Sequence, residues 1–220
     1  MKRTLAFLAA LAICIASIVG CGKKGSPFAP ASTVHPYFPL AIGNWWEYKA
    51  TVEILGEQVR GYVGYVRTEV TGTTDIGGKI YFVVVMTSTE QSEQVTAYYR
   101  STDQGIFSYS TDLSTEFLSL PSSLKVGSSW TVGPVTETVD TRSFSCSETW
   151  WVISRESVTI PAGTFNNCYK IGREMIMDGE KIGESYLWLA PGVGQVRVEG
   201  NIGIFGIVVR EELVRYSLRL

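Results

Sequence analysis

The sequence predicts an all-β fold of about eleven antiparallel strands in a meander, either sandwich-like or half-barrel-like. First, apolar and polar residues alternate with a period of two, as between Trp46 and Ile54, which is typical of a strand with one face in solvent. Second, tight-turn residues separate the apolar stretches. Third, no long amphipathic helical pattern follows the first 20 residues. The turn residues include Gly77-Gly78, Asp178-Gly179 and Gly200-Asn201.

Eleven strands are expected in chain order. Five come first, over 46–54, 62–70, 79–87, 95–100 and 105–110. Six follow, over 130–139, 148–160, 164–177, 181–189, 194–199 and 204–218. The segment between the two groups, 111–125, is rich in Ser and Leu without a clear period, and we interpret it as a loop or a short helix. Within the last strand, 209–213 also fits one helical turn.

Two parts of the chain, residues 38–110 and 120–200, are predicted to be copies of one unit. Trp46 and Trp130 both end the pattern Leu-x-(Ile/Val)-Gly-x-x-Trp, 84 residues apart. Further pairs keep the same order, with Tyr98 and Tyr186 88 residues apart and Gly105 and Gly194 89 apart. One such unit cannot bury its apolar face alone, and a second copy would cover it. We therefore expect a rough two-fold axis that places Trp46 and Trp130 in equivalent core positions.

The N-terminus carries the pattern of an export signal. Lys2 and Arg3 precede an apolar run, 5–18, that is too short for a comfortable membrane span. Ile18-Val19-Gly20-Cys21 then resembles the bacterial lipoprotein signal, or lipobox. The resemblance implies cleavage before Cys21 and a diacylglyceryl group and palmitate on that residue. An ordinary signal peptide that ends in Cys is the alternative.

Three segments are expected: a signal peptide over 1–20, a flexible tether over 21–36 that is rich in Gly, Pro and Ser, and a β domain over 37–220. Without the signal the chain has 17 basic and 21 acidic residues and no basic run. This balance argues against nucleic acid and against an electrostatic membrane-binding face, so the lipid is the expected membrane contact. Gly22 differs from the Asp that retains enteric lipoproteins in the inner membrane. In a Gram-negative organism this implies the outer membrane, with the domain facing the periplasm.

Two cysteines remain after Cys14 leaves with the signal and Cys21 takes the lipid. Cys146 and Cys168 are a possible disulfide, because an oxidising compartment favours bridging. A plain hairpin would place Cys168 opposite residues near Glu156, about ten residues and roughly 33 Å from Cys146. A bridge requires Cα atoms about 4.4–6.8 Å apart. Both alternatives stay open at this point.

The sequence lacks the usual catalytic constellations. His35 is the only histidine and lies in the Pro-flanked tether, where nothing is expected to fix its geometry. We predict no catalytic residue, no metal site and no cofactor, and hence a protein that is not an enzyme. A hydrolase with a carboxylate pair is the least favoured alternative, because the candidate acids also fit solvated strand edges or turns. These acids are Asp103, Glu148, Asp178 and Glu184.

Tryptophans carry the clearest binding signal. In the adjacent pairs Trp45-Trp46 and Trp150-Trp151, one ring of each pair points outward on a strand. Trp46 and Trp130 are expected to anchor the core. Trp45 and one of Trp150 and Trp151 are candidate contacts for a ligand or partner, at an exposed surface or a concave mouth. Alternatively, these rings only cover the far side of a two-layer β fold.

Three motifs extend the resemblance to uncharacterised bacterial lipoproteins. Residues 37–48 read Tyr-Phe-Pro-Leu-Ala-Ile-Gly-Asn-Trp-Trp-Glu-Tyr and are similar to the start of the mature domain in that group. Residues 158–165 contain Pro-Ala-Gly-Thr-Phe, and residues 189–194 read Leu-Ala-Pro-Gly-Val-Gly. The motifs consist of turns and strand starts. The resemblance implies the class of protein and transfers no activity.

Two functions from different classes are therefore expected. The first is a membrane-anchored, non-enzymatic β module of the cell envelope that binds a partner or an apolar ligand, for example as a lipid-handling half-barrel. An aromatic patch or an apolar cavity walled by strands would favour it. The second is a structural lipoprotein that assists an envelope assembly through an open sheet edge.

Overall fold

The structure is a computed structural model that describes residues 35–54, 62–88, 94–139, 142–203 and 206–219. The signal, the lipobox with Cys21 and nearly all of the tether lie outside these residues. No helix in the described part is long and apolar enough to cross a membrane. The described residues form twelve strands. They are β1 (Trp45–Ile54), β2 (Tyr62–Ile76), β3 (Lys79–Ser88), β4 (Gln94–Ser101), β5 (Gly105–Ser110), β6 (Thr115–Pro121), β7 (Ser129–Val139), β8 (Arg142–Ile160), β9 (Gly163–Met177), β10 (Glu180–Ala190), β11 (Gly194–Ile202) and β12 (Ile207–Ser217).

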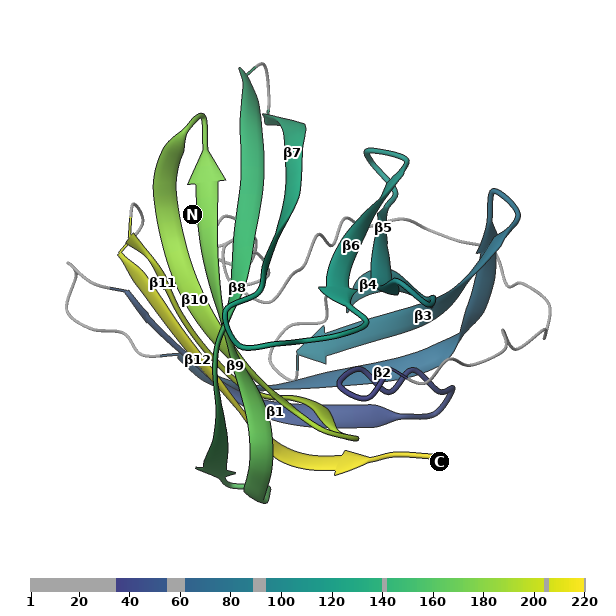
Figure 1. The fold of residues 1–220 in the computed structure, drawn as a ribbon, viewed down its shortest axis with the longest axis vertical. Coiled ribbons are helices and arrows are strands. Elements are labelled where there is room, and N and C mark those ends of the chain that lie inside the picture. Colours follow the sequence, from purple (N-terminus) through teal and green to yellow (C-terminus); the bar gives the residue numbers. More distant parts are fainter. Residues whose placement is uncertain (1–34, 55–61, 89–93, 140–141, 204–205, 220) are drawn as a thin grey trace.

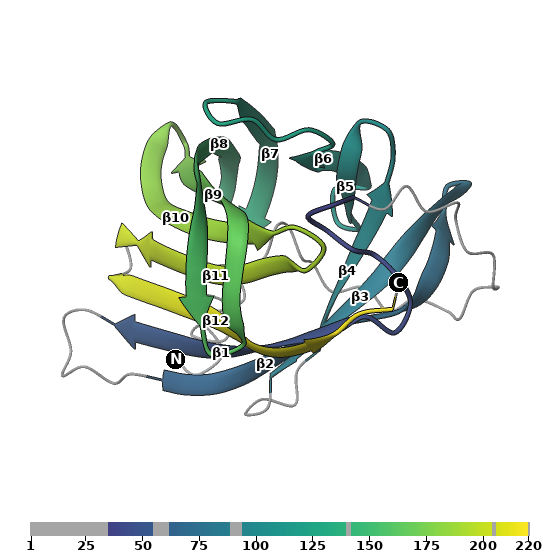
Figure 2. The same ribbon diagram turned by 60° about the horizontal axis from the view of Figure 1, so that its bottom comes forward.

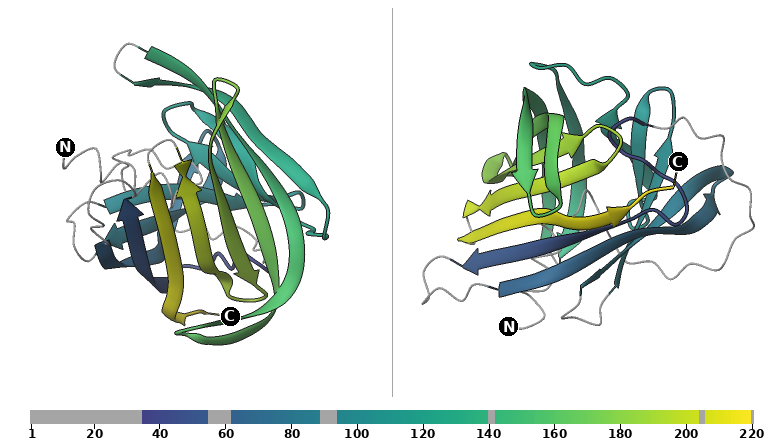
Figure 3. Two further views of the ribbon diagram at one scale, coloured as in Figure 1. Left: turned by 90° about the vertical axis from the view of Figure 1, so that its left-hand side faces the viewer. Right: turned by 90° about the horizontal axis from the view of Figure 1, so that it is seen from below.

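All twelve strands join one antiparallel sheet in the order β6-β5-β4-β3-β2-β1-β12-β11-β10-β9-β8-β7. Two six-stranded meanders thus meet where β1 pairs with β12. The sheet curls until its edge strands β6 and β7 come next to each other (Figures 1 and 2). Figure 3 shows the curvature from two further sides. The all-β prediction is confirmed, and the sheet forms a nearly closed barrel rather than a sandwich.

The one strand beyond the eleven that we predicted is β6. It lies in segment 111–125, which we interpreted as a loop or short helix, and that interpretation is wrong. Its one serine, Ser119, hides the strand pattern because it faces the interior. Ser119 and Ser108 of β5 are buried, and the Ser119 hydroxyl donates a hydrogen bond to Ser108 over 2.7 Å. On the opposite face the Glu116 carboxylate accepts hydrogen bonds from Tyr81 and Arg100. Mutual hydrogen bonding makes the burial of small polar side chains tolerable.

The C-terminal end also differs from expectation. Residues 209–213 lie within β12 and form no helical turn. Gly200 and Asn201, predicted as a tight turn, belong to β11. The turn follows them, where Gly206 N donates to Gly203 O over 3.1 Å. The alternation through β12, and not the Gly-Asn pair, therefore locates this hairpin.

The core lies on the inner face of the curled sheet and draws on both halves. Trp46 is buried as predicted, and its Nε1 donates to Val193 O over 2.7 Å. Trp130 is half-buried against the core, and its ring stacks on Trp150 at 5.9 Å between centroids. Burying each large apolar side chain contributes about 1.5–3 kcal/mol. The fully buried residues include Val70, Ile106, Val152, Ile171, Val196 and Leu213.

The starts of β1 and β7 have the same backbone geometry. Gly43 and Gly127 share a φ of 88° and each donates across the sheet over 2.8 Å, to Val70 O and Val152 O respectively. A positive φ of this kind favours glycine, which explains the Gly in both Leu-x-(Ile/Val)-Gly patterns. A duplicated six-stranded unit would give the starts of β1 and β7 this same geometry. However, β1 lies in mid-sheet and β7 at an edge, and the duplication of 38–110 and 120–200 stays a prediction.

The segment before β1 is held in place by hydrogen bonds to other parts of the chain. His35 is 5% exposed, its Nε2 lies 3.0 Å from Pro121 O, and the backbone N–H of Tyr37 donates to its Nδ1. The expectation that nothing fixes His35 is therefore wrong. Asn44 is fully buried, with Nδ2 donating to Pro39 O and Oδ1 accepting from the backbone of Arg219. Asn44 thus joins the segment before β1 to the residues that follow β12.

Candidate ligand-binding cavity

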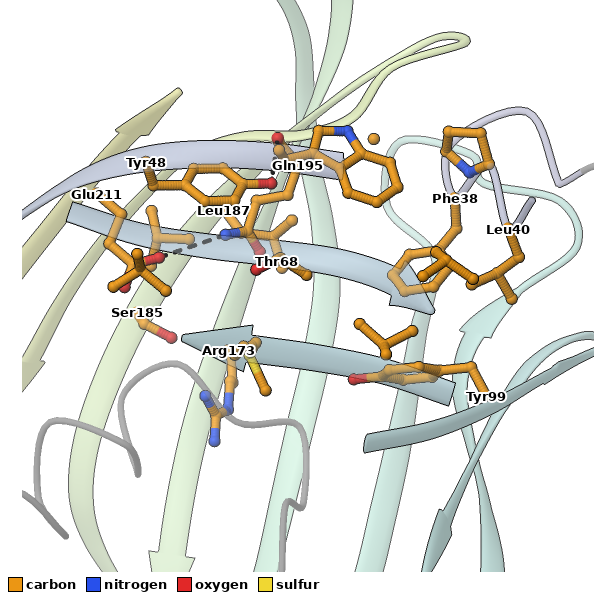
Figure 4. A pocket seen from close by; sticks show the side chains of 18 of the residues that line it. Phe38, Leu40, Tyr48, Thr68, Tyr99, Arg173, Ser185, Leu187, Gln195 and Glu211 are labelled. Atoms are coloured by element: carbon orange, nitrogen blue, oxygen red, sulfur yellow. Dashed lines mark hydrogen bonds between the residues drawn. The ribbon is translucent and has the colours of Figure 1, made fainter. Parts of the chain in front are cut away.

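The inner face of the barrel contains a partly open cavity of about 110 Å³. Figure 4 shows that it has two chemically different ends. Phe38, Leu40 and Tyr99 lie at one end, while Glu211, Tyr48 and Ser185 lie at the other. The remaining wall is mainly apolar. It includes Trp46, Val66, Val70, Val84, Met86 and Trp150.

The period of two explains why a glutamate lies inside. Glu211 and Leu213 alternate with Arg210 and Glu212 along β12, so the first pair faces the core and the second faces outward. Outside, Arg210 and Glu212 take part in ion pairs with residues of β11. Inside, Glu211 lies opposite Ala50 of β1. Glu211 is accordingly among the residues that line the cavity.

Glu211 is 2% exposed and has few partners. Its Oε2 is 3.5 Å from Gln195 Nε2, and its Oε1 has no hydrogen-bond partner among the described residues. Burial penalises the charged form and raises the pKa of Glu211 to about 7. Tyr48 beside it donates its hydroxyl to Gln195 O over 3.1 Å, and burial together with the nearby Glu211 raises the pKa of this phenol. Below neutral pH both side chains at this end are therefore uncharged.

Arg173 supplies a second polar group to the cavity wall. Its side chain is almost fully buried, forms an ion pair with Glu148 and lies over the Trp150 ring at 5.2 Å. Trp150 Nε1 in turn donates to Glu148 Oε2 over 3.1 Å. The Arg173 Nε has no hydrogen-bond partner in the described part of the chain. A partner for the guanidinium charge is thus in place, while one of its donors remains open.

Only one of the three tryptophans predicted to contact a ligand lines the cavity. That residue is Trp150, which is buried. Trp151 lies on the opposite face, where its ring covers Gly172 so closely that any Cβ there would collide with it. Trp45 also faces outward, with the Arg67 guanidinium 4.3 Å above its ring. For Trp45 and Trp151 the structure thus shows packing on the outer face.

No disulfide joins Cys146 and Cys168, both of which lie among the described residues. Cys146 pairs with Met177 and Cys168 with Glu156, as the plain hairpin register requires. The two positions on β9 are nine residues apart, or about 30 Å along a strand. Burial raises the pKa of the Cys168 thiol, which disfavours its reactive thiolate form.

None of the four acids considered for a hydrolase is among the described residues that line the cavity. Glu148 is held by Arg173, and Glu184 forms an ion pair with Lys181. Asp178 lies in the turn after β9 and accepts a hydrogen bond from the Ser145 backbone. Asp103 lies in the turn before β5. The structure therefore does not bring them together at this site.

Sequence reasoning missed the two buried charged residues of the cavity, Glu211 and Arg173. A signal for Glu211 was present, because Val209, Glu211 and Leu213 fall on one face of a strand. The alternative interpretation of this stretch as a helical turn obscured it. For Arg173 the sequence carries no comparable signal, since its partner Glu148 lies 25 residues away.

Part of the chain, residues 108–201, matches a family model described as DUF3108-like. The match runs from β5 into β11. A search of the curated proteins finds no match for this chain.

A search of the solved structures finds similar bacterial proteins. A Bacteroides fragilis protein described as a "putative exported protein with YmcC-like fold" has a TM-score of 0.54 and 15% identity, over 84% of this chain and 100% of that chain. A Parabacteroides distasonis protein described as a "putative lipoprotein" has a TM-score of 0.48 and 18% identity, over 84% of this chain and 100% of that chain. A beta-barrel-like protein of the domain of unknown function DUF1849 from Brucella abortus has a TM-score of 0.44 and 12% identity, over 81% of this chain and 98% of that chain. The similarity to the Bacteroides fragilis protein shows the barrel-like fold.

Proposed function

We propose that this chain is a lipid-anchored, non-enzymatic β module of the bacterial cell envelope that binds an apolar ligand inside its barrel. The observation that carries the proposal is the partly open, mainly apolar cavity with a few polar groups at one end. Small-molecule sites have this composition, because apolar walls supply affinity and a few polar groups fix orientation. The export signal and the lipobox at Cys21 support the envelope location. The similar Bacteroides fragilis protein is described in terms of export as well.

The cavity size limits what enters it. A cavity of about 150 Å³ holds one benzene ring, and this one measures about 110 Å³. It therefore suits a short apolar segment or a small ring rather than several long acyl chains. The ligand is expected to place that segment among Phe38, Leu40 and Tyr99.

An assembly role through an open sheet edge is a second candidate. Strands β6 and β7 each pair on one side only, and their free edges lie next to each other. Unpaired edges can accept a strand from another protein. In an assembly role the protein would work with an empty cavity, and this expectation separates the second candidate from ligand binding.

Filling the cavity is expected to remove the ligand. Val66 of β2 lines the cavity, and Val66→Phe places a ring in it. Native mass spectrometry of the full-length protein from envelope extract should show a retained small molecule in the wild type. In the Val66→Phe variant we expect at least a tenfold lower ligand-bound fraction.

The matched control is Val63→Phe, the same change on the same strand at a half-exposed position of the opposite face. This variant should keep the wild-type bound fraction. Circular dichroism of both variants checks that they fold. If folded Val66→Phe protein carries as much ligand as Val63→Phe protein, the cavity does not hold it and the proposed function is wrong.

A further inference from the structure

We propose that the cavity binds an uncharged amphiphile whose hydrogen-bond acceptor, such as an ester or ketone carbonyl, is held by the buried carboxyl group of Glu211. This inference rests on the proposed function and specifies the ligand class for the same site. It begins from an unpartnered polar atom. The Glu211 Oε1 lies in the cavity wall, is shielded from solvent and has no hydrogen-bond partner among the described residues.

Such an atom has a cost that a ligand can remove. A buried polar group without a partner is less stable than one that is hydrogen-bonded, because it has lost its bonds to water without replacing them. Gln195 approaches only the other oxygen, at 3.5 Å, which is the outer limit of a hydrogen bond. The carboxyl group lies in the cavity wall, at the end that it shares with Tyr48 and Ser185. A ligand atom placed there would complete the hydrogen bonding of the side chain.

The surroundings of Glu211 indicate that its carboxyl group acts as a donor. Tyr48 of β1 is the titratable group beside it, and Val198 of β11 faces it as an apolar neighbour. Thr68 of β2 and Ser185 of β10 line the same end and carry no charge. Arg173 of β9 also lines the cavity, but Glu148 of β8 neutralises it.

Among the described residues no cation beside Glu211 therefore stabilises a carboxylate, and burial favours the protonated acid up to about pH 7. A protonated carboxyl offers one O–H donor. Its complement is an acceptor oxygen on an uncharged ligand.

Charged ligands fit the site less well. An anionic head would approach a second acid in an apolar wall, and its own desolvation would be costly. An ammonium head would bind the ionised form of Glu211 instead, so its affinity would rise with pH. The three head-group classes therefore have different pH dependences, which makes them separable by experiment.

The test uses methyl hexanoate, hexylamine and hexanoate, which share a six-carbon chain. Each is titrated by calorimetry into the full-length protein in lipid nanodiscs, at about pH 6 and about pH 8, with empty nanodiscs as the blank. We expect methyl hexanoate to bind best and to lose about tenfold in affinity at the higher pH, since the protonated fraction of a group with a pKa of about 7 falls about tenfold.

Two variants of Glu211 separate donation from packing. Glu211→Gln keeps an N–H donor without titrating, so its ester affinity should be the same at both pH values. Glu211→Leu removes the donor and should lower ester affinity about tenfold or more at the lower pH. The Val63→Phe protein, with its change on the opposite face, should behave like wild type.

Three outcomes would overturn this inference: tighter binding of hexylamine than of the ester with a rise toward pH 8, ester binding independent of pH in the wild type, or no binding of any probe. The proposed function fails by a different result, equal ligand retention in the Val66→Phe and Val63→Phe proteins. Tight hexylamine binding would thus leave the cavity a ligand site and reject only the ligand class.

Discussion

The Cys21→Ser variant is expected to incorporate no palmitate and to keep residues 1–20. Lipid transfer requires the thiol, and by the lipobox resemblance cleavage follows lipidation. Each buried methylene of an acyl chain contributes about 0.8 kcal/mol to membrane binding, so two or three chains account for nearly all of the anchoring. The mature chain has a formal charge of −4, from 17 basic and 21 acidic residues, and no basic run to replace them. Labelling with radioactive palmitate and intact mass analysis measure both effects.

Cys14→Ser is the matched control, since Cys14 lies in the segment that is removed. Its palmitate incorporation and mature mass should equal those of the wild type. Cys146 and Cys168 stay in place in both variants. Labelled palmitate on the Cys21→Ser protein would show that another residue carries the lipid, and the lipobox interpretation would then be rejected.

Local pattern predicted most strands, and it failed where polar residues face inward. The alternation that located β1 is plain because Tyr48 and Ala50 are apolar and buried. The inward Ser119 of β6 breaks the same rule, since its hydrogen bond to Ser108 depends on a neighbouring strand. A hydrogen bond between two strands cannot be inferred from the residues of one. The missed strand follows directly from that.

The closure of the barrel also depends on long-range pairing. The plain hairpin, one of the two alternatives left open by the sequence, places Cys168 opposite Glu156, and the structure has this register. The pairing of Trp45 with Ser217 joins residues 172 positions apart, and no turn specifies it. His35 illustrates the same limit, because its contact with Pro121 exists only once β6 has formed.

The cavity could be predicted only in part, for a related reason. Trp150 belonged to a pair of which one ring was expected at an exposed surface or a concave mouth, so it was a candidate from the sequence, but the structure buries it. Glu211 became a candidate only when β12 was known to be a strand paired with β1 on one side and β11 on the other. The chemistry of the site thus depends on the pairing of β12 with β1, where Glu211 lies opposite a residue 161 positions away.

The free energy of unfolding is expected to fall by about 2–3 kcal/mol between about pH 5 and about pH 8 in the wild type relative to Glu211→Gln. Burial raises the pKa of Glu211 from its ordinary 4.5 to about 7 in the folded protein. A raised pKa means that the folded state binds the proton more tightly than the unfolded state. The resulting stabilisation is complete below about pH 4.5 and is lost as the pH rises through about 7.

The comparison with Glu211→Gln is needed because His35 acts in the opposite direction. Burial lowers the pKa of His35, so its contribution to stability is lost as the pH falls below its ordinary value of 6.5. His35 is present in both proteins, and its effect cancels in the difference. Urea unfolding of the two full-length proteins, followed by tryptophan fluorescence across this pH range, gives that difference. A difference that stays constant or grows with pH would show that Glu211 is not held in its protonated form by burial.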